Sequence, residues 1–230
     1  VIMIAIIDYG VGNLFSLQSS LRYIGAEVEV TADEEKIRNA DKLILPGVGA
    51  FSDAAAKLRA TGLDKVIKEE AAKGKELMGI CLGMQLLFEK SYEYGEHEGL
   101  GLLKGTVIPM ENTIPSQLKI PHIGWNRLQF QKDSPLLRYI KENDFVYFVH
   151  SYYAVDCEES LLATTDYGKE MTAAVELRNI KGCQFHPEKS GQVGLDILRG
   201  FCEEETASSS KIEEAEARSA DTEDRKGGRA

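Results

Sequence analysis

The sequence contains no hydrophobic run long enough to cross a membrane, and it is poor in cysteine and tryptophan. No stretch approaches the roughly 18 consecutive apolar residues of a membrane span. The four cysteines lie far apart and include no Cys-X-X-Cys pair, which argues against both a zinc site and a disulfide framework. These absences favour a globular protein of a reducing compartment, and we expect a cytoplasmic protein without a metal ion or cofactor.

Positive charge is also scarce. Lys and Arg number 27 against 37 Asp and Glu, which gives a formal net charge of -10. Nucleic acids and anionic membranes attract basic surfaces, so this acidic chain is not expected to bind either of them. The length of 230 residues and the hydrophobic content of 43% suit one sizeable domain with its own core.

Large apolar residues become rare near the end of the chain. Beyond residue 205 the only large apolar residue is Ile212, among Ser, Glu, Lys and Arg. Such a segment cannot bury enough apolar surface to offset the entropy lost on ordering. We therefore predict a domain over residues 1–205 and a disordered low-complexity tail over 206–230.

The apolar runs of the first half alternate with helical patterns. They predict strands over residues 2–7, 27–31, 42–45 and 76–80, and helices over 14–24, 33–39, 52–59, 63–73 and 82–88. Strands that alternate with helices build a largely parallel sheet that is covered by helices. We expect the first strand to be a central one.

The second half is mostly β. Its patterns predict strands over 102–109, 127–131, 145–149, 152–155, 161–166, 172–176 and 182–185, a short helix over 135–142, and a closing amphipathic helix over 190–201. The predicted fold class is therefore α/β, with a parallel half followed by a mixed or antiparallel β portion in one continuous domain.

The most informative stretch is Gly79-Ile80-Cys81-Leu82-Gly83, where a predicted strand turns sharply into a predicted helix. Glycines relieve the crowding at such a turn, and the residue at its apex is pushed out of the sheet. This is the nucleophile-elbow pattern with Cys in place of Ser. The N–H groups and dipole of the helix would favour a thiolate and could donate to an oxyanion. The alternative is a small buried cysteine beside a structural turn.

A second informative stretch is Phe185-His186-Pro187-Glu188. Proline biases His186 toward extended backbone, and residues two apart in an extended chain point to the same side. Glu188 could therefore hold one imidazole nitrogen and leave the other to act as a base. Alone, such a string is most often a turn, but with an elbow cysteine it indicates the other two members of a catalytic triad.

Two glycine-containing loops follow predicted strands of the first half. Residues 46–51 combine a proline with two glycines, which bring bare backbone close to a neighbour unless the segment is an ordinary turn. Residues 8–13 follow the first strand, at an edge where ligands of open α/β sheets collect. The Gly-X-Gly of this second loop is too short to indicate a phosphate-binding loop.

Four other residues have simpler interpretations. His97 is expected to be a solvated loop residue, and Cys183 a packed strand residue. His150 could be a base, but such a histidine is more often hydrogen-bonded in a core or wall. Trp125, the only tryptophan, is interpreted as closing the core between strands.

Taken together, the cysteine elbow and the Phe-His-Pro-Glu string about a hundred residues later resemble the class I glutamine amidotransferases. The likeness is closer to one group, the glutaminase subunits of imidazole glycerol phosphate synthase. It is carried, over about residues 2–201 and in that family's order, by DYGVGN, PGVGAF, GICLGMQLLF, PHIGWN, YFVHSYY and QFHPEKSG. The GWN motif, and PGVG in place of PGG, distinguish this group from the related amidotransferases of anthranilate and carbamoyl-phosphate synthesis. Many members carry His at the position of Ala50, but the oxyanion role there belongs to the backbone.

The resemblance implies a flavodoxin-like class I glutamine amidotransferase fold and a catalytic triad of Cys81, His186 and Glu188. It implies that the oxyanion receives backbone N–H groups of Val48, Gly49 and Leu82. It implies that glutamine is contacted by Gln85, Glu93, Ser151 and Tyr152. It implies that a partner interface and an ammonia exit are lined by Asn13, Tyr147 and Lys189.

The resemblance also implies a reaction and a partner. Glutamine would be hydrolysed to glutamate and ammonia through a thioester. The ammonia would pass to a (β/α)8-barrel cyclase in a heterodimer, which forms imidazole glycerol phosphate and an aminoimidazole carboxamide ribotide in histidine biosynthesis, a lyase-type reaction overall. Three alternatives stay open, namely a different class I amidotransferase, a stand-alone cysteine hydrolase on the same scaffold, and a non-catalytic binding subunit. The intact triad argues against the last.

Overall fold

The computed structural model describes residues 2–203. The predicted domain boundary at 205 and the predicted tail over 206–230 lie outside the described residues. Within 2–203, no helix combines the length and the apolar character that crossing a membrane requires.

Most of the described strands form one sheet. Among the described residues this sheet has eight strands, in the order β2 (Glu27–Thr31), β1 (Met3–Ile7), β3 (Lys42–Leu45), β4 (Glu76–Ile80), β14 (Ile180–Cys183), β13 (Glu170–Leu177), β12 (Leu161–Asp166) and β9 (Gln129–Phe130). The strands from β2 to β14 are parallel, and the pairs beyond β14 are antiparallel. The α/β class with an added antiparallel portion is thus confirmed, but β1 lies one place from the edge and not at the centre.

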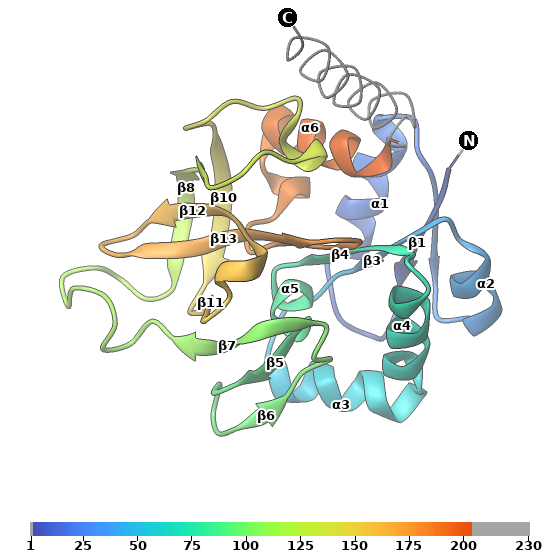
Figure 1. The fold of residues 1–230 in the computed structure, drawn as a ribbon, viewed down its shortest axis with the longest axis horizontal. Coiled ribbons are helices and arrows are strands. Elements are labelled where there is room, and N and C mark those ends of the chain that lie inside the picture. The colour runs from blue at the N-terminus through green and yellow to red at the C-terminus, as the bar shows by residue number, and fades with distance from the viewer. Residues whose placement is uncertain (1, 204–230) are drawn as a thin grey trace, which may run out of the picture.

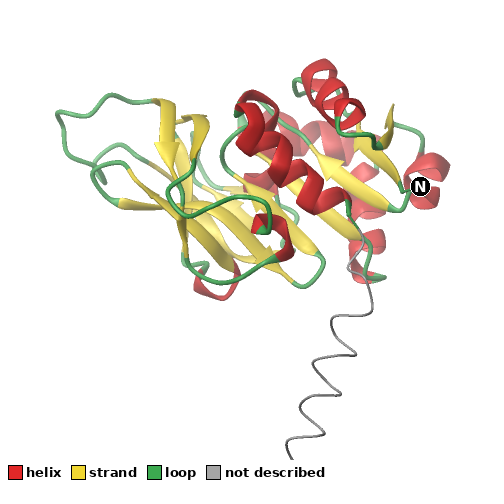
Figure 2. Ribbon diagram, turned by 90° about the horizontal axis from the view of Figure 1, so that it is seen from above, coloured by secondary structure: helices red, strands yellow, loops and turns green. Residues whose placement is uncertain are grey.

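The centre of the sheet is buried on both faces, which explains why β1, β3 and β4 are largely apolar. On β1, Ile4 and Ile6 pack toward one face while Ala5 and Ile7 pack toward the other. Helices α1 (Leu14–Tyr23) and α6 (Gly191–Cys202) cover the first face, and α3 (Phe51–Thr61) and α4 (Leu63–Ala72) cover the second (Figure 1). Figure 2 shows helices lying over the strands of the sheet in the view from above.

Two smaller sheets complete the β portion. One has the order β11 (Tyr152–Val155), β7 (Leu103–Pro109), β5 (Phe88–Ser91) and β6 (His97–Glu98), and the other pairs β10 (Phe145–His150) with β8 (His122–Arg127). The remaining short helices are α2 (Glu34–Asn39), α5 (Leu82–Leu86), η1 (Pro135–Leu137), η2 (Glu158–Ser160) and η3 (Pro187–Lys189). Strand β10 ends and strand β11 begins on either side of Ser151, which lines the cavity of the candidate site.

Three sequence predictions of secondary structure were wrong. The helix predicted over 82–88 ends at Leu86, because Phe88 already pairs as β5 with the small sheet. The helix predicted over 135–142 is only the single 3-10 turn η1. Strands β5, β6 and β8 were missed; β5 and β6 are short, and the partner of β8, strand β10, lies further along the chain.

The register between β4 and β14 positions the candidate site. Ile80 lies opposite Cys183 at the end of both strands, and the N–H of Cys81 donates to the carbonyl of Cys183 at 2.7 Å. The two segments singled out in the sequence therefore leave the sheet side by side. Their meeting is a consequence of parallel pairing, since the carboxyl ends of parallel strands share one edge.

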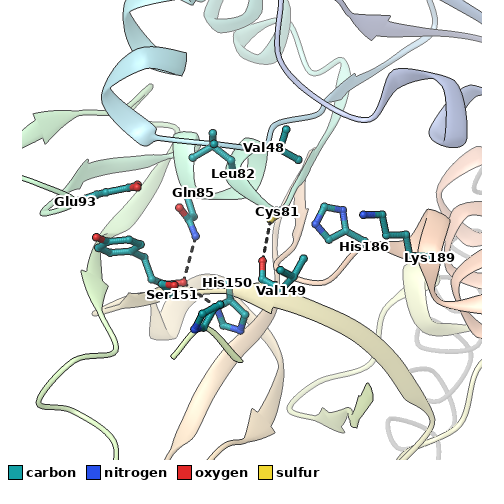
Figure 3. Close-up of a pocket in the computed structure, with 13 residues that line it drawn as sticks. Val48, Cys81, Leu82, Gln85, Glu93, Val149, His150, Ser151, His186 and Lys189 are labelled. Atoms are coloured by element: carbon teal, nitrogen blue, oxygen red, sulfur yellow. Dashed lines mark hydrogen bonds between the residues drawn. The ribbon is translucent and has the colours of Figure 1, made fainter. Parts of the chain in front are cut away.

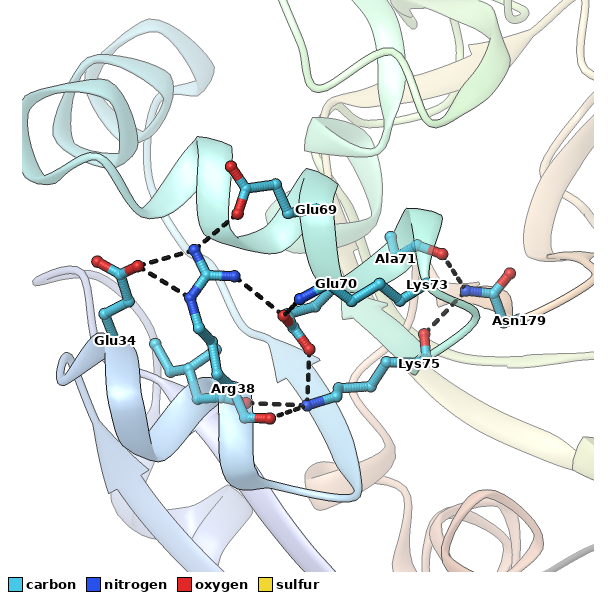
Figure 4. Close-up of polar contacts among 9 residues, drawn as sticks. Glu34, Arg38, Glu69, Glu70, Ala71, Lys73, Lys75 and Asn179 are labelled. Carbon is cyan, nitrogen blue, oxygen red and sulfur yellow. Dashed lines mark hydrogen bonds and ion pairs between the residues drawn. The ribbon is translucent and has the colours of Figure 1, made fainter.

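A buried carboxylate ties α2, α4 and β4 together away from this edge (Figure 4). The side chain of Glu70 is 4% exposed and forms ion pairs with Lys73 at 2.7 Å, Lys75 at 2.9 Å and Arg38 at 3.0 Å. Burial acts to raise the pKa of Glu70, but the three cations outweigh it and lower this pKa to about 2. Glu70 is therefore ionised at neutral pH and compensates positive charge from α2 and from the turn that joins α4 to β4.

We expect Glu70→Gln to lower the free energy of unfolding by about 3 kcal/mol at pH 7, because it leaves cations without their buried counter-charge. Urea titration measures this change. Glu69→Gln is the matched control, since Glu69 pairs with Arg38 from a side chain that is 56% exposed and should cost about 0.5 kcal/mol or less. Equal losses in both variants would contradict a special role for the buried carboxylate.

Candidate active site

Cys81 occupies the turn between β4 and α5 in a strained backbone conformation. Its φ is 54° and its ψ is -113°, a combination that L residues rarely adopt. The residue is only 8% exposed. The predicted nucleophile elbow is therefore present in its geometry, and the strain is held by the packing around it.

Glycines make this packing possible, as the sequence predicted. A Cβ on Gly83 would lie 1.8 Å from the carbonyl oxygen of Leu45, so α5 could not approach β3 with any other residue there. A Cβ on Gly47 would lie 2.8 Å from the hydroxyl of Tyr9. The 46–51 loop is thus pressed against the elbow, and it is more than an ordinary turn.

One of the backbone N–H groups that were expected to bind an oxyanion already has a hydrogen-bond partner. The N–H of Leu82 donates to the carbonyl of Gly47 at 3.3 Å, so this loop carbonyl occupies the position where an oxyanion would be received. Helix α5 has only five residues, and its dipole is accordingly weaker than the predicted longer helix would provide. In this conformation the elbow lacks the N–H of Leu82 as an available donor.

His186 stands between the thiol and a carboxylate. Its Nδ1 lies 2.8 Å from Oε1 of Glu188, and its ring stands beside the thiol of Cys81, whose sulfur donates to the carbonyl of Val149 at 3.9 Å (Figure 3). Burial acts to lower the pKa of His186, but its interactions with Cys81 and Glu188 outweigh burial and raise this pKa. The arrangement of thiol, imidazole and carboxylate is that of a nucleophile, its base and the group that orients the base.

The backbone around His186 differs in part from the prediction. His186 is extended, with φ -98° and ψ 101°, as expected from the proline that follows. Glu188, however, lies in the 3-10 turn η3 and not in extended chain. The tight turn still returns its carboxylate to the imidazole, so the contact was predicted correctly and the local conformation was not.

A cavity of about 340 Å³ opens above the thiol (Figure 3). Ten of the predicted site residues line it: Val48, Gly49, Cys81, Leu82, Gln85, Glu93, Ser151, Tyr152, His186 and Lys189. Pro121, Val149 and His150 line it as well and were not assigned to the site from sequence. Segments from both halves of the chain therefore converge on one concave space.

The predicted glutamine contacts occupy the side of the cavity away from His186. Gln85 is 4% exposed, and its Nε2 donates to the carbonyl of Tyr152 at 3.2 Å. The carboxylate of Glu93 accepts the N–H of Phe51 at 3.1 Å, where it caps α3. Burial raises the pKa of Glu93. This region thus presents fixed polar groups within a largely buried wall.

The three predicted interface residues are not all at the cavity. Lys189 lines it, whereas Asn13 precedes α1 and Tyr147 lies on β10 outside the lining. The interpretation of Trp125 as a core residue was wrong, since it is 55% exposed and contacts the ring of Tyr147 at 6.0 Å between centroids. In β8 the strand alternation turns His122 inward and Trp125 outward.

His122 and His150 form a buried pair that the sequence did not indicate. Nδ1 of His122 lies 3.0 Å from Nε2 of His150, and Nδ1 of His150 lies 2.9 Å from the carbonyl of Tyr152. That carbonyl can only accept, so His150 donates to it and accepts from His122. Burial lowers the pKa of both rings, which favours the neutral form of each. The expectation that His150 is a hydrogen-bonded wall residue is confirmed, although a partner 28 positions away in the sequence had no local signal.

The pair should make stability sensitive to mild acid. Burial lowers the pKa of His122 to about 4, and burial is also the main cause that lowers the pKa of His150 to about 3. In the unfolded chain a histidine pKa lies near 6.5, so the unfolded state takes up protons first as pH falls. The free energy of unfolding should then decrease from about pH 6.5 toward pH 4.

We expect the wild type to lose about 1.4 kcal/mol more per pH unit than His122→Phe between pH 6 and pH 4.5, because the variant lacks one such titration. The phenyl ring suits the site, where His122 stacks on Tyr167 and Phe148. Urea titrations at several pH values measure both slopes, with His97→Phe on the half-buried strand β6 as the control. Parallel curves for wild type and His122→Phe would contradict the assignment.

Comparison with known proteins agrees with this geometry. The family model described as glutamine amidotransferase class-I matches residues 5–204. The chain is 52% identical over 202 residues to the imidazole glycerol phosphate synthase subunit HisH of Caldanaerobacter subterraneus, covering 87% of this chain and 98% of the relative. It is 53% identical over 198 residues to the subunit of the same name from Aquifex aeolicus, covering 85% and 94%.

Solved structures share the fold at lower identity. PurLQS from Thermotoga maritima superposes with a TM-score of 0.69 at 22% identity, covering 86% of this chain and 96% of that chain. A glutamine amidotransferase from the same organism gives 0.59 at 15% identity, covering 94% and 85%. At this identity these structures speak for the fold alone. The family match and the identity to the curated relatives go further: this chain belongs to the class I glutamine amidotransferases and, within them, to the HisH subunits of imidazole glycerol phosphate synthase.

Proposed function

We propose that this chain hydrolyses the side-chain amide of glutamine with Cys81 as nucleophile, His186 as general base and acid, and Glu188 as the group that orients His186. The observation that carries the proposal is the placement of the Cys81 thiol beside the His186 imidazole, which is held by the Glu188 carboxylate, at a cavity of about 340 Å³. A positioned base and a strained, protruding nucleophile are what acyl transfer through a covalent intermediate requires.

The proposed reaction has two halves. The thiol proton passes to His186 while the sulfur of Cys81 bonds to the amide carbon. As the tetrahedral intermediate collapses, the amide nitrogen takes this proton from His186 and leaves as ammonia. Water, deprotonated by the same imidazole, then attacks the thioester; the carbon–sulfur bond breaks, the proton on His186 returns to the sulfur, and glutamate is released. Glu188 holds the imidazole through Nδ1, which keeps the second nitrogen directed at the sulfur.

The oxyanion of both intermediates is proposed to be received by the N–H of Leu82 and by backbone of the loop at Val48 and Gly49. The bond from Leu82 to the carbonyl of Gly47 has to open for this. Gly49, at φ 95°, has no heavy atom within 4 Å of a Cβ position, so the loop has room to turn. The described conformation therefore fits a resting state.

Glutamine binding is proposed to involve Gln85, Glu93 and the backbone at Ser151 and Tyr152. Both amide hydrogens of Gln85 are engaged, by the carbonyl of Tyr152 and by Oε1 of Gln184. Only its oxygen is left for a ligand, and this oxygen can accept from an ammonium or amide group. A carboxylate at Glu93 would likewise favour the α-ammonium of an amino acid.

We further propose that the chain acts in the cytoplasm as one half of a heterodimer with a (β/α)8-barrel cyclase, to which it delivers ammonia without a cofactor of its own. The relatives' shared name, subunit of imidazole glycerol phosphate synthase, supports a partner. Trp125, Ile123 and Phe145 are exposed apolar residues of the β8–β10 sheet and would suit an interface beside Asn13, Tyr147 and Lys189.

The test is reconstitution. The chain is mixed with a cyclase and its phosphoribulosyl substrate, and imidazole glycerol phosphate is measured with glutamine or with ammonium salt as the nitrogen source. Product that depends on both proteins when glutamine is supplied supports the proposal. Glutamine hydrolysis at full rate without the cyclase, and no product with it, would identify a stand-alone hydrolase instead.

A further inference from the structure

One buried side chain touches the sulfur without having a place in the proposed triad. Gln184 is fully buried, and its Nε2 lies 3.8 Å from Sγ of Cys81. It follows β14 directly and lies two residues before His186, yet its side chain reaches the opposite side of the thiol, toward Gln85. A fully buried amide in this position needs partners for both its oxygen and its nitrogen.

The orientation of this amide is determined by its neighbours. The carbonyl of Tyr152 can only accept, so Gln85 must direct its Nε2 toward it. The same nitrogen lies 3.1 Å from Gln184, which must therefore present Oε1 to Gln85. The remaining end of the Gln184 amide, its NH2 group, is then the end that faces the sulfur.

The carbonyl of Tyr152 is itself held from the other side. It also accepts Nδ1–H of His150, which is in turn bound by His122. His122 therefore donates to His150, and His150 donates to the carbonyl of Tyr152. The same carbonyl also accepts the hydrogen bond from Gln85. The amide of Gln184 cannot rotate by 180° without placing two donors against each other at Gln85.

We propose that Gln184 is a further residue of the reaction, an enforced hydrogen-bond donor that stabilises the Cys81 thiolate and holds the sulfur in line with the cavity. The inference rests on the proposed role of Cys81 as nucleophile. A hydrogen bond to an ionised group is stronger than one to a neutral group, so the contact favours the thiolate over the thiol. His186 provides the proton transfer, and Gln184 provides a donor that carries no charge and exchanges no proton.

The test measures the thiol and needs no glutamine. In Gln184→Met, which is similar in size and has no donor, the rate of Cys81 alkylation by iodoacetamide at pH 7 should fall about tenfold. At high pH, where the thiolate forms in any case, the rates of variant and wild type should converge. The titratable groups around the sulfur are His186, Tyr9, Glu188 behind the imidazole, and His150 across the cavity; all are kept in the variant.

Gln85→Met provides a second, independent variant. It leaves Gln184 in place but removes the partner that orients its amide, so the alkylation rate at pH 7 should fall by less than in Gln184→Met. Gln131→Met is the control, because Gln131 donates to Thr164 from an exposed position at the far edge of the sheet, next to β9. Peptide mapping assigns the alkylated cysteine, and thermal denaturation confirms that each variant is folded.

Wild-type alkylation at pH 7 in both glutamine variants would overturn the proposal. A loss that persists unchanged at high pH would also overturn it, since that result would indicate altered access to the thiol. In the reconstituted complex, Gln184→Met should lower kcat and leave KM nearly unchanged. If the wild-type thiol behaves as described while no glutamine is hydrolysed, the proposed function fails and the role of Gln184 toward the thiol stands.

Discussion

Replacing Cys81 by alanine is expected to lower glutamine hydrolysis by at least about 10⁴-fold, while the assembled complex still forms product from ammonium salts. The loss is large because members of a triad act as a unit, and no second group can take the place of the nucleophile. Within the described residues, the other thiols are remote from the cavity or sealed in the core, with Cys183 fully buried on β14. Ammonium bypasses the glutaminase half, so the cyclase chemistry should survive.

The measurement is glutamate release, together with product formation from each nitrogen source. Cys202→Ala is the control, since this half-buried thiol lies at the end of α6 and does not line the cavity. Alanine retains the Cβ, so the strained backbone at position 81 is kept and folding should be nearly unchanged. Retained glutaminase activity in Cys81→Ala would remove the basis of the proposed triad.

The second large effect concerns coupling to the cyclase. We expect the chain alone to hydrolyse glutamine slowly, and the cyclase with its ligand bound to raise kcat by about 10² to 10³-fold with a much smaller change in KM. One missing oxyanion donor has an effect of this size. Donors that act only in the transition state change kcat, because they leave the binding of the ground state unaltered.

The structure gives this expectation a specific cause. The N–H of Leu82 is engaged by the carbonyl of Gly47, and the loop that carries this carbonyl borders the cavity at Val48, which is 41% exposed. Tyr9 anchors the start of the loop through a 2.6 Å bond to the carbonyl of Pro46. A partner that contacts the exposed part of the loop could therefore turn one peptide without unfolding its surroundings.

Steady-state kinetics test this with the chain alone, with ligand-free cyclase and with liganded cyclase. Cys81→Ala in the liganded complex gives the background rate. If the lone chain works at the full rate and the partner adds nothing, the resting geometry at Leu82 has no catalytic consequence. An effect confined to KM would instead indicate that the partner improves glutamine binding and leaves the oxyanion site as it is.

Local chemistry made much of this protein predictable from sequence. Strands β1 to β4 were located to within a residue, because β1, β3 and β4 are largely apolar runs buried on both faces and β2 alternates Val with Glu. The parallel strand β14 was predicted two residues too late in the chain. The elbow was visible because only small residues allow the approach between α5 and β3, where Gly83 faces the carbonyl of Leu45. The contact between His186 and Glu188 was visible because it spans two residues.

Other features depend on pairs that are distant in the chain. Strand β8 was missed, and Trp125 was assigned to the core, because the face that a strand buries depends on the partner it pairs with, here β10. The His122–His150 pair and the contact of Gln184 with Cys81 join positions 28 and 103 apart. The protonation state of a buried histidine and the orientation of a buried amide are determined by their neighbours, and residue type alone does not specify them. The hydrogen bond from the N–H of Leu82 to the carbonyl of Gly47 likewise results from the packing of the 46–51 loop against the elbow, which sequence alone does not reveal.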